Sequence, residues 1–359
     1  MVKNYIGKLF MGLFLVTIGT VRMFCQPSAS TDLSGEWRFA LDPDNQGVTA
    51  NWFNQSLPHK ISLPGILQSQ GYGDEISTKT PWVLSLYDRN WFEREDFKAY
   101  TKPGSTKVPF LSQPPRHYVG AAWYQRDIDI SENWRGKRIV LHLERPRWES
   151  TVWIGNRKIG SARSLVAPHT FDLGQIGPGK HRLTIRLDTS MILPYRPDAH
   201  GVSDSLGMSW NGITGKIELA ATSPVWIDDA QVYPDLPNKA AVVKIKIGNS
   251  SGKAGSGLLR ATGVETRVNW SVDGGEIQFA VPLPKDAEIW NEFHRTLHTI
   301  NIRFAGPDAD DRRDVTFGFR DIKAVGKEFQ LNGRRIYLRG THHGGDFPLT
   351  GYPPTDVAY

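Results

Sequence analysis

The chain has 359 residues, a length at which two or three domains are expected. Its content of 39% hydrophobic and 22% charged residues is ordinary for a soluble globular protein. The formal net charge is +6, but basic and acidic residues are interleaved, as they are over residues 134–149. A mixed, solvated surface is therefore expected, and a phosphate-binding stripe for nucleic acid is not.

Residues 1–25 have the pattern of a secretory signal peptide. Lys3 and Lys8 flank the start of a short apolar stretch over 9–21, and a polar Gln-Pro-Ser-Ala-Ser segment follows Cys25. The stretch is too short and wrongly flanked to indicate an integral membrane span. Cys25 is the only cysteine, so no intrachain disulfide is possible; it is either the residue before cleavage or a lipid-modified residue after it. We expect export to a bacterial periplasm or outer cell surface.

Short segments that alternate between apolar and polar residues follow the signal peptide. The clearest are residues 35–41, 123–130, 138–143, 151–154, 181–187 and 216–219. Alternation with period two indicates antiparallel strands with one buried face. Gly155-Asn156 predicts a hairpin turn, and no long amphipathic helix is indicated. Residues 30–222 are therefore predicted to form one β-sandwich of jelly-roll size.

A second run of strand patterns begins after Ser223-Pro224. Its segments are residues 225–227, 241–247, 258–261, 275–281, 298–304 and 314–317. This gives about seven strands in roughly 95 residues, a number and spacing typical of an immunoglobulin-like β-sandwich. We predict that this second unit covers residues 223–319.

The last segment, 320–359, carries a different pattern. An Asn332-Gly333 turn, which is a strong hairpin signal, is followed by an apolar strand over 336–338. That strand leads into Arg339, two histidines and Asp346. A strand that ends in polar, titratable residues is typical of the first strand of a (β/α)8 barrel, which needs roughly 250 residues. We therefore expect this segment to be the start of an incomplete, truncated catalytic barrel.

Several motifs, taken in order, resemble those of glycoside hydrolase family 2. They are Leu-Ser-Gly-Glu-Trp-Arg-Phe at 33–39, Leu-Pro-Gly at 63–65, Ala-Trp-Tyr-Gln-Arg at 122–126, Trp-Arg-Gly-Lys-Arg-Ile at 134–139, Val-Trp-Ile-Gly-Asn at 152–156, Trp-Asn-Gly-Ile-Thr-Gly-Lys-Ile-Glu-Leu at 210–219 and Phe-Gly-Phe-Arg at 317–320. Each motif is short, and the resemblance depends on their order and spacing over nearly the whole mature chain.

The resemblance implies hydrolysis of O-glycosyl bonds in a carbohydrate, a polysaccharide or an oligosaccharide, without a cofactor. Members of the family include β-galactosidases, β-glucuronidases and β-mannosidases. They retain configuration by means of two glutamates at barrel strand ends, an acid/base and a nucleophile. Both positions lie beyond the first barrel strand, so this chain is expected to lack them and to be inactive alone. An Asn291-Glu292 pair occurs too early to be the acid/base.

Four residues are candidates for contacting substrate. Arg339, in the position of the family's Arg-Gly, would orient a catalytic carboxylate or donate to sugar hydroxyls, or would form a structural ion pair. His342 and His343 are neighbours, so one of them would face the site, although the family's pattern places its histidine elsewhere. Asp204 would correspond to an aspartate that reaches the active site from a loop, or would form an ordinary Asx turn. Together with Asp346, the two histidines lack metal-ligand spacing, so no metal site is predicted.

Two other classes of protein remain open. One is a non-catalytic carbohydrate-binding or scaffold protein that consists of the sandwich domains. The other is a cell-surface adhesion protein of immunoglobulin type, in which the Arg-Gly-Thr-His-His segment at 339–343 would have no purpose.

Overall fold

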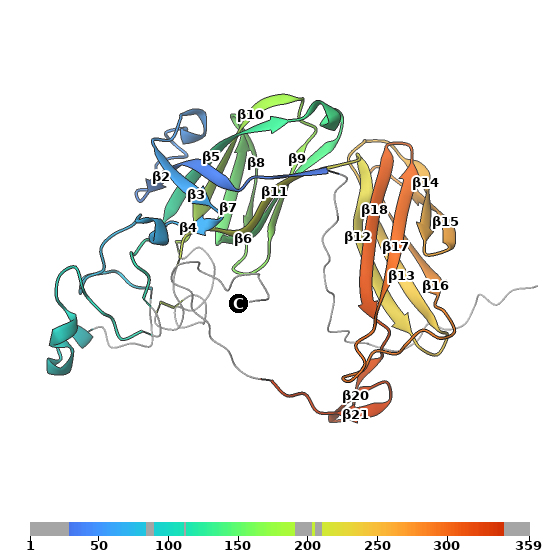
Figure 1. The fold of residues 1–359 in the computed structure, drawn as a ribbon. Coiled ribbons are helices and arrows are strands. Elements are labelled where there is room, and N and C mark those ends of the chain that lie inside the picture. Colours follow the sequence, from blue (N-terminus) through green and yellow to red (C-terminus); the bar gives the residue numbers. More distant parts are fainter. Residues whose placement is uncertain (1–28, 84–89, 111–112, 191–202, 205–209, 341–359) are drawn as a thin grey trace, which may run out of the picture.

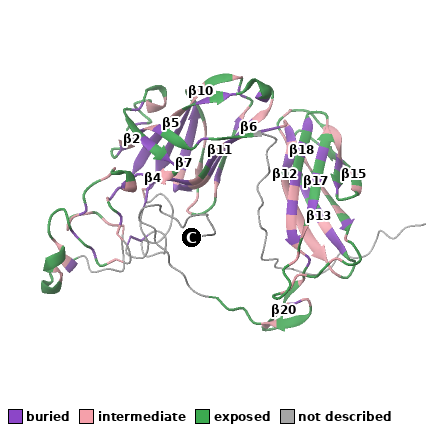
Figure 2. Cartoon of the chain, viewed as in Figure 1, coloured by how far each residue is buried: buried purple, intermediate pink, exposed green. Residues whose placement is uncertain are grey.

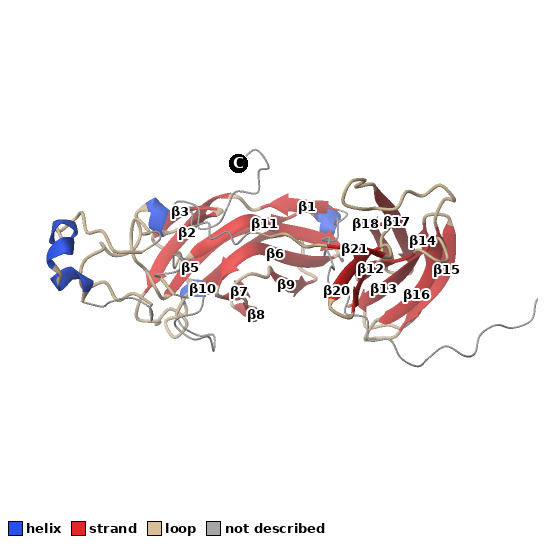
Figure 3. Ribbon diagram, turned by 90° about the horizontal axis from the view of Figure 1, so that it is seen from below, coloured by secondary structure: helices blue, strands red, loops and turns tan. Residues whose placement is uncertain are grey.

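The computed structural model describes residues 29–340, except 84–89, 111–112, 191–202 and 205–209. Two β-sandwiches lie side by side, followed by a small three-stranded sheet (Figure 1). The expectation of a mainly β protein is confirmed. Helices in the described part are short 3₁₀ turns, drawn blue in Figure 3. They are η1 (Trp52–Asn54), η2 (Gln68–Gln70), η3 (Trp91–Glu93), η4 (Glu95–Tyr100) and η5 (Glu132–Trp134). Among the described residues, no helix has the length and apolarity needed to cross a membrane.

The first sandwich is built from two antiparallel sheets. The five-stranded sheet contains β1 (Ala29–Asp32), β11 (Gly212–Thr222), β6 (Arg138–Arg147) and β9 (His169–Gly174) in that order, with β4 (Gly65–Ile66) on β11. The six-stranded sheet has the order β3 (His59–Leu63), β2 (Gly35–Asp42), β5 (Ala121–Ile130), β10 (Gly179–Asp188), β7 (Glu149–Ile154) and β8 (Arg157–Arg163). The hairpin predicted at Gly155-Asn156 joins β7 to β8.

The core of the first sandwich lies between the two sheets. Alternate residues of β2 and β5, among them Trp37, Phe39 and Tyr124, point into it and are almost completely buried. A second layer, which contains Trp123 and Trp153, covers the outer face of the six-stranded sheet. The period-two pattern therefore underestimates burial, because parts of this sheet are covered on both faces.

The second sandwich is one seven-stranded sheet that folds back on itself until it is nearly closed. Its order is β15 (Val264–Trp270), β14 (Gly255–Ala261), β17 (Leu297–Gly306), β18 (Ala309–Gly318), β12 (Val225–Asp235), β13 (Ala240–Asn249) and β16 (Gly275–Pro282). The count of seven strands is confirmed, although the sequence analysis did not single out the strand at Val264–Trp270. Purple buried residues alternate with green exposed ones along these strands in Figure 2. The predicted domain limits stay a prediction, but two separate buried clusters lie on either side of Thr222–Val225.

The three-stranded sheet follows the second sandwich in the chain. It consists of β19 (Ile322–Val325), β20 (Glu328–Leu331) and β21 (Arg334–Ile336). Asn332 and Gly333 form the predicted turn, with φ values of 52° and 79°. Both residues adopt the positive φ that two-residue hairpin turns require. The strand after the turn ends at Ile336, so it begins and ends earlier than the expected 336–338, and it pairs within this small sheet. The barrel assignment of 320–359 stays a prediction.

Candidate functional site at the loop end of the first sandwich

Five strands of the first sandwich, β5, β6, β7, β10 and β11, end or begin together at one edge of the molecule. Register pairs Asp188 with Ala121 and with Glu149 in one sheet, and Gly212 with Arg147 in the other. All the long connections of this sandwich leave from this edge, including the segment 67–120. We call this edge the loop end. It gathers polar and aromatic side chains from distant parts of the sequence.

Asn211 holds several of these connections together. Its side chain is completely buried; the amide nitrogen donates to the Gly120 carbonyl at 3.0 Å and to Thr189 Oγ1 at 3.2 Å. Its side-chain oxygen accepts from the Tyr124 hydroxyl at 3.1 Å. The Asn211 backbone N–H donates to Gln68 Oε1 at 3.1 Å. The side chain therefore satisfies groups from two loops and a strand, which is a structural role.

A buried ion cluster stiffens the neighbouring strand ends. Arg186 Nη2 donates to Asp188 Oδ2 and to Asn45 Oδ1, both at 2.6 Å, and Arg186 Nη1 lies 3.8 Å from Glu149 Oε1. Glu149 also accepts a hydrogen bond from Arg163. Such a cluster fixes β10 and β7 in place, because each buried charge has a partner of opposite sign.

Asp204, a predicted substrate-contacting residue, lies at this loop end but is only 3% exposed. Asp204 Oδ2 accepts from the Val83 N–H at 2.6 Å, and the Asp204 N–H donates to the Val83 carbonyl at 2.7 Å. The carboxylate thus ties its own loop to residues just before 84–89. This bond joins residues 121 positions apart, so it is a tertiary contact and not a local Asx turn, and it does not test contact with a substrate.

His117 is the titratable neighbour of Asp204. It is 4% exposed, pairs with Asp74 through backbone hydrogen bonds, and has the Trp82 ring edge-on at 5.0 Å between centroids. Burial lowers the pKa of His117, and the negative charges of Asp204 and Asp74 oppose that shift. Its Nε2 atom is buried and has no hydrogen-bond partner among the described residues. A neutral imidazole nitrogen is thus available for one further polar contact.

Two tryptophans flank a buried arginine at the same loop end. The Arg147 guanidinium lies over the Trp148 ring at 5.2 Å and over the Trp210 ring at 5.5 Å. The Trp148 Nε1 atom is buried without a partner in the described part of the chain. The sequence analysis did not select Arg147 or Trp148. Both lie between the predicted strand segments, and their burial is visible only in the structure.

Arg339 lies outside this group. It follows β21, is exposed, and shares no hydrogen bond or ion pair with Asp204 among the described residues. His342 and His343 lie outside the described residues, so the predicted cluster of Arg339 with a histidine is not tested. Asn291 forms an Asx turn by accepting from the Phe293 and His294 N–H groups, and Glu292 is exposed on that turn. No group of three metal-ligating side chains occurs in the described ranges.

Comparisons with known proteins place this geometry in context. No family model matches the chain. A β-glucuronidase from Paenibacillus borealis is 22% identical over 341 residues, which cover 89% of this chain and 50% of that protein. The β-galactosidase large subunit of Latilactobacillus sakei is 22% identical over 91% of this chain and 52% of its own length. The chain therefore spans about half the length of these curated relatives.

Solved structures give the same result for the fold. The crystal structure of Ruminococcus gnavus β-glucuronidase matches 89% of this chain and 49% of its own, with a TM-score of 0.59 and 18% identity. The β-glucuronidase of an uncultured Clostridium species matches 90% of this chain, with a TM-score of 0.59 and 19% identity. The sequence relatives confirm the resemblance to glycoside hydrolase family 2: this chain is related to that family over about nine-tenths of its length.

Proposed function

We propose that the protein takes part in the hydrolysis of O-glycosidic bonds as a glycoside hydrolase of family 2 type. In this proposal the described residues supply its two non-catalytic sandwiches. The observation that supports it most is the extent of the similarity: one alignment runs through both sandwiches and includes 89% of the chain. The names of the relatives suggest a β-glucuronide or a β-galactoside as substrate.

The loop end is the part of the first sandwich that we assign to substrate. Trp148, Trp210 and His117 are buried at this edge, with 2%, 3% and 4% of their surface exposed, so they would support the site rather than touch the sugar. Sugar sites depend on polar groups that a rigid surrounding holds in place. In the proposed mechanism this surface would position a glycan, while two glutamates outside the described residues would carry out retaining hydrolysis.

The test compares two proteins on a panel of nitrophenyl β-D-glucuronide, β-D-galactoside and β-D-mannoside. We expect the 359-residue chain to show no turnover, because retaining hydrolysis needs two carboxylates about 5 Å apart. The product of the complete gene, sequenced through and past the Tyr359 codon, is expected to hydrolyse at least one of them. Sugar binding without any turnover by either protein would favour the non-catalytic scaffold.

Glu292→Gln is the control for this assay. If the 359-residue chain shows turnover and Glu292→Gln abolishes it, the proposal that the two sandwiches are non-catalytic is wrong. Export is part of the same proposal, since the pattern over residues 1–25 supports a cleaved signal peptide. Mass spectrometry of envelope-localised protein that retains Met1 would contradict it.

A further inference from the structure

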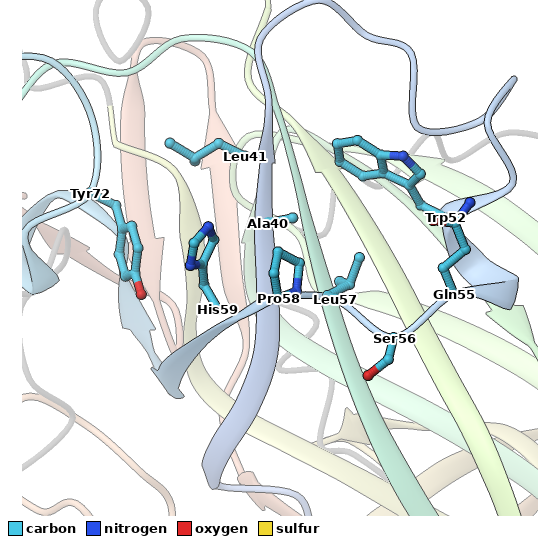
Figure 4. A pocket seen from close by; sticks show the side chains of 9 residues that line it. All are labelled: Ala40, Leu41, Trp52, Gln55, Ser56, Leu57, Pro58, His59 and Tyr72. Atoms are coloured by element: carbon cyan, nitrogen blue, oxygen red, sulfur yellow. The ribbon is translucent and has the colours of Figure 1, made fainter.

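A cavity of about 410 Å³ lies at the free edge of β2, where the chain before β3 leaves the sheet. The pairing of β2 with β3 ends at Phe39 and His59, so Ala40 and Leu41 have no strand beside them on that edge. Figure 4 shows Trp52 on one side of β2 and His59 with Tyr72 on the other. The lining residues are Ala40, Leu41, Trp52, Gln55, Ser56, Leu57, Pro58, His59 and Tyr72.

The aromatic walls of this cavity are fixed in position. The Trp52 carbonyl accepts from Gln125 Nε2 at 3.1 Å, and the Trp52 ring packs on Trp123 with centroids 5.9 Å apart. The Tyr72 hydroxyl donates to the Lys60 carbonyl at 2.5 Å, and its ring lies 4.6 Å from that of Phe39. Rigid aromatic walls bind a flat apolar ligand face with little loss of side-chain freedom.

The rim of the cavity carries polar groups that have spare hydrogen-bonding capacity. The Ser56 hydroxyl and the ring nitrogens of His59 have no protein partner within the described residues, and both residues are exposed. Gln55 donates from Nε2 to the Ala50 carbonyl at 2.7 Å, which leaves its side-chain oxygen as an acceptor. The rim therefore supplies both donors and acceptors, as a hydroxylated ligand requires.

The charges near the cavity are already used by protein partners. Lys60 pairs with Glu36 at 2.8 Å, and Arg182 donates to the Asn54 and Gln55 carbonyls at 3.1 and 3.2 Å. No lysine, arginine, aspartate or glutamate lines the cavity. A carboxylate on the ligand would find no cation there, so a neutral ligand fits better than an anionic one.

We propose that this cavity binds a neutral hexopyranose unit of a glycan. The apolar face of the pyranose would lie against the wall formed by Trp52 or by His59 and Tyr72, and its hydroxyls would meet Gln55, Ser56 and His59. The volume falls within the range of small-ligand sites, about 300–1,000 Å³. That the ligand is a carbohydrate rests on the proposed function. That it is neutral is inferred from the uncharged residues that line the cavity.

The test is ligand-observed NMR and calorimetric titration of the 359-residue chain with lactose and cellobiose, with glucuronic acid as the charged comparison. We expect saturable binding of a neutral sugar with Kd on the order of 1 mM, and at least about tenfold weaker binding of glucuronic acid. Trp52→Ala and His59→Ala should each weaken binding about tenfold.

Two further variants separate binding from folding. Phe53 is next to Trp52 in η1 but stacks on Trp153 at 5.5 Å and does not line the cavity, so Phe53→Ala should keep the affinity. Ser56 is exposed, so Ser56→Arg should fold and block the cavity. Any of three results would overturn the proposal. The chain could show no saturable binding, Trp52→Ala and Ser56→Arg could both keep the wild-type affinity, or glucuronic acid could bind as well as the neutral sugars. Such a result would leave the proposed function intact, because that proposal is tested by hydrolysis with the complete gene product and not by sugar binding to this cavity.

Discussion

Among its described residues the second sandwich buries only two charged or polar side chains, Asp311 and Arg313, whereas the first buries many, most of them near its loop end. Arg313 donates to the Ile227 carbonyl at 2.6 Å and Asp311 accepts from the Ile227 N–H at 2.8 Å, so both fasten β18 to β12. The rest of the second core is apolar. Buried polar groups are costly unless they are paired, so their concentration near the loop end indicates that this edge is held in one defined arrangement.

The largest test of this difference is Arg186→Ala. Removing the guanidinium leaves Asp188 buried without a counter-charge, while Glu149 keeps Arg163, and breaking a buried pair costs about 3–5 kcal/mol. Hydrogen exchange should show lost protection in β10 and β7 and unchanged protection in β12 and β13. An equal loss of protection in both sandwiches would mean that they unfold as one unit and have no separate stabilities.

Acid should also destabilise the first sandwich selectively. Burial lowers the pKa of His169 to about 4 and also lowers those of His117 and His142, whereas no buried histidine occurs among the described residues of the second sandwich. As the pH falls below 6.5, these histidines bind protons in the unfolded chain before they do so in the folded chain. Their contribution to the free energy of unfolding is therefore fully present above pH 6.5 and is lost between pH 6.5 and about 4. His169 alone would account for about 3 kcal/mol at the low end.

The measurement is denaturant unfolding at a series of pH values, with His169→Gln as the comparison. Gln cannot take up a proton and can still bond to the Ser150 hydroxyl, which lies 2.5 Å from His169 Nδ1. The variant should be less sensitive to acid over this window. A wild-type stability that stays flat from pH 7 to 4 would refute the predicted linkage.

A smaller effect is expected where the sandwiches meet. The Arg138 guanidinium of β6 lies 3.8 Å from the centre of the Trp226 ring of β12, and Arg138 also pairs with Asp172 at 2.7 Å. Arg138→Ala should weaken coupling between the sandwiches by about 1 kcal/mol, seen as wider separation of their unfolding transitions. Asp172→Asn, which keeps the ring contact, should change this separation less; an equal change would assign the coupling to the ion pair instead.

The smallest effect is predicted for the surface of the second sandwich. Arg260 and Glu265 pair at 2.7 Å across β14 and β15, with both side chains more than half exposed. Arg260→Ala should change the free energy of unfolding by less than about 1 kcal/mol. This variant removes an exposed ion pair, whereas Arg186→Ala removes a buried one. If both variants lowered the free energy of unfolding equally, burial would not explain the difference between the two sandwiches.

The fold was largely predictable because period-two alternation is a local signal. It located most long strands, the β7–β8 hairpin and the Asn332-Gly333 turn. It missed β1, β3, β4 and β19, which are short, and it also missed β9 and β15, although burial alternates along both. Most of the twelve tryptophans lie in the cores. The buried ones are Trp37, Trp91, Trp123, Trp134, Trp148, Trp153, Trp210 and Trp270.

The site was much less predictable, because its members are brought together by tertiary contacts. His117 and Asp204 are far apart in sequence and meet only through the folding of two loops. Arg147 and Trp148 lie between the predicted strand segments 138–143 and 151–154, so the alternating pattern did not reach them. Asp204 was selected through the family resemblance, and the structure gives it a hydrogen bond to Val83 that no sequence spacing could indicate.

Asn211 has a consequence for the chemical ageing of the protein. The chain contains two Asn-Gly pairs, at Asn211-Gly212 and Asn332-Gly333, and such pairs deamidate most readily when the following backbone nitrogen can attack the side-chain amide. Asn211 is fully buried with its amide held by Gly120 and Thr189, so the attack geometry is out of reach in the native state. Asn332 also donates from its amide, to the Trp290 carbonyl at 3.0 Å, but it is only partly buried and lies in a hairpin turn. Stored protein should therefore accumulate aspartate and isoaspartate at Asn332 first, and modification at Asn211 would record that the first sandwich had opened.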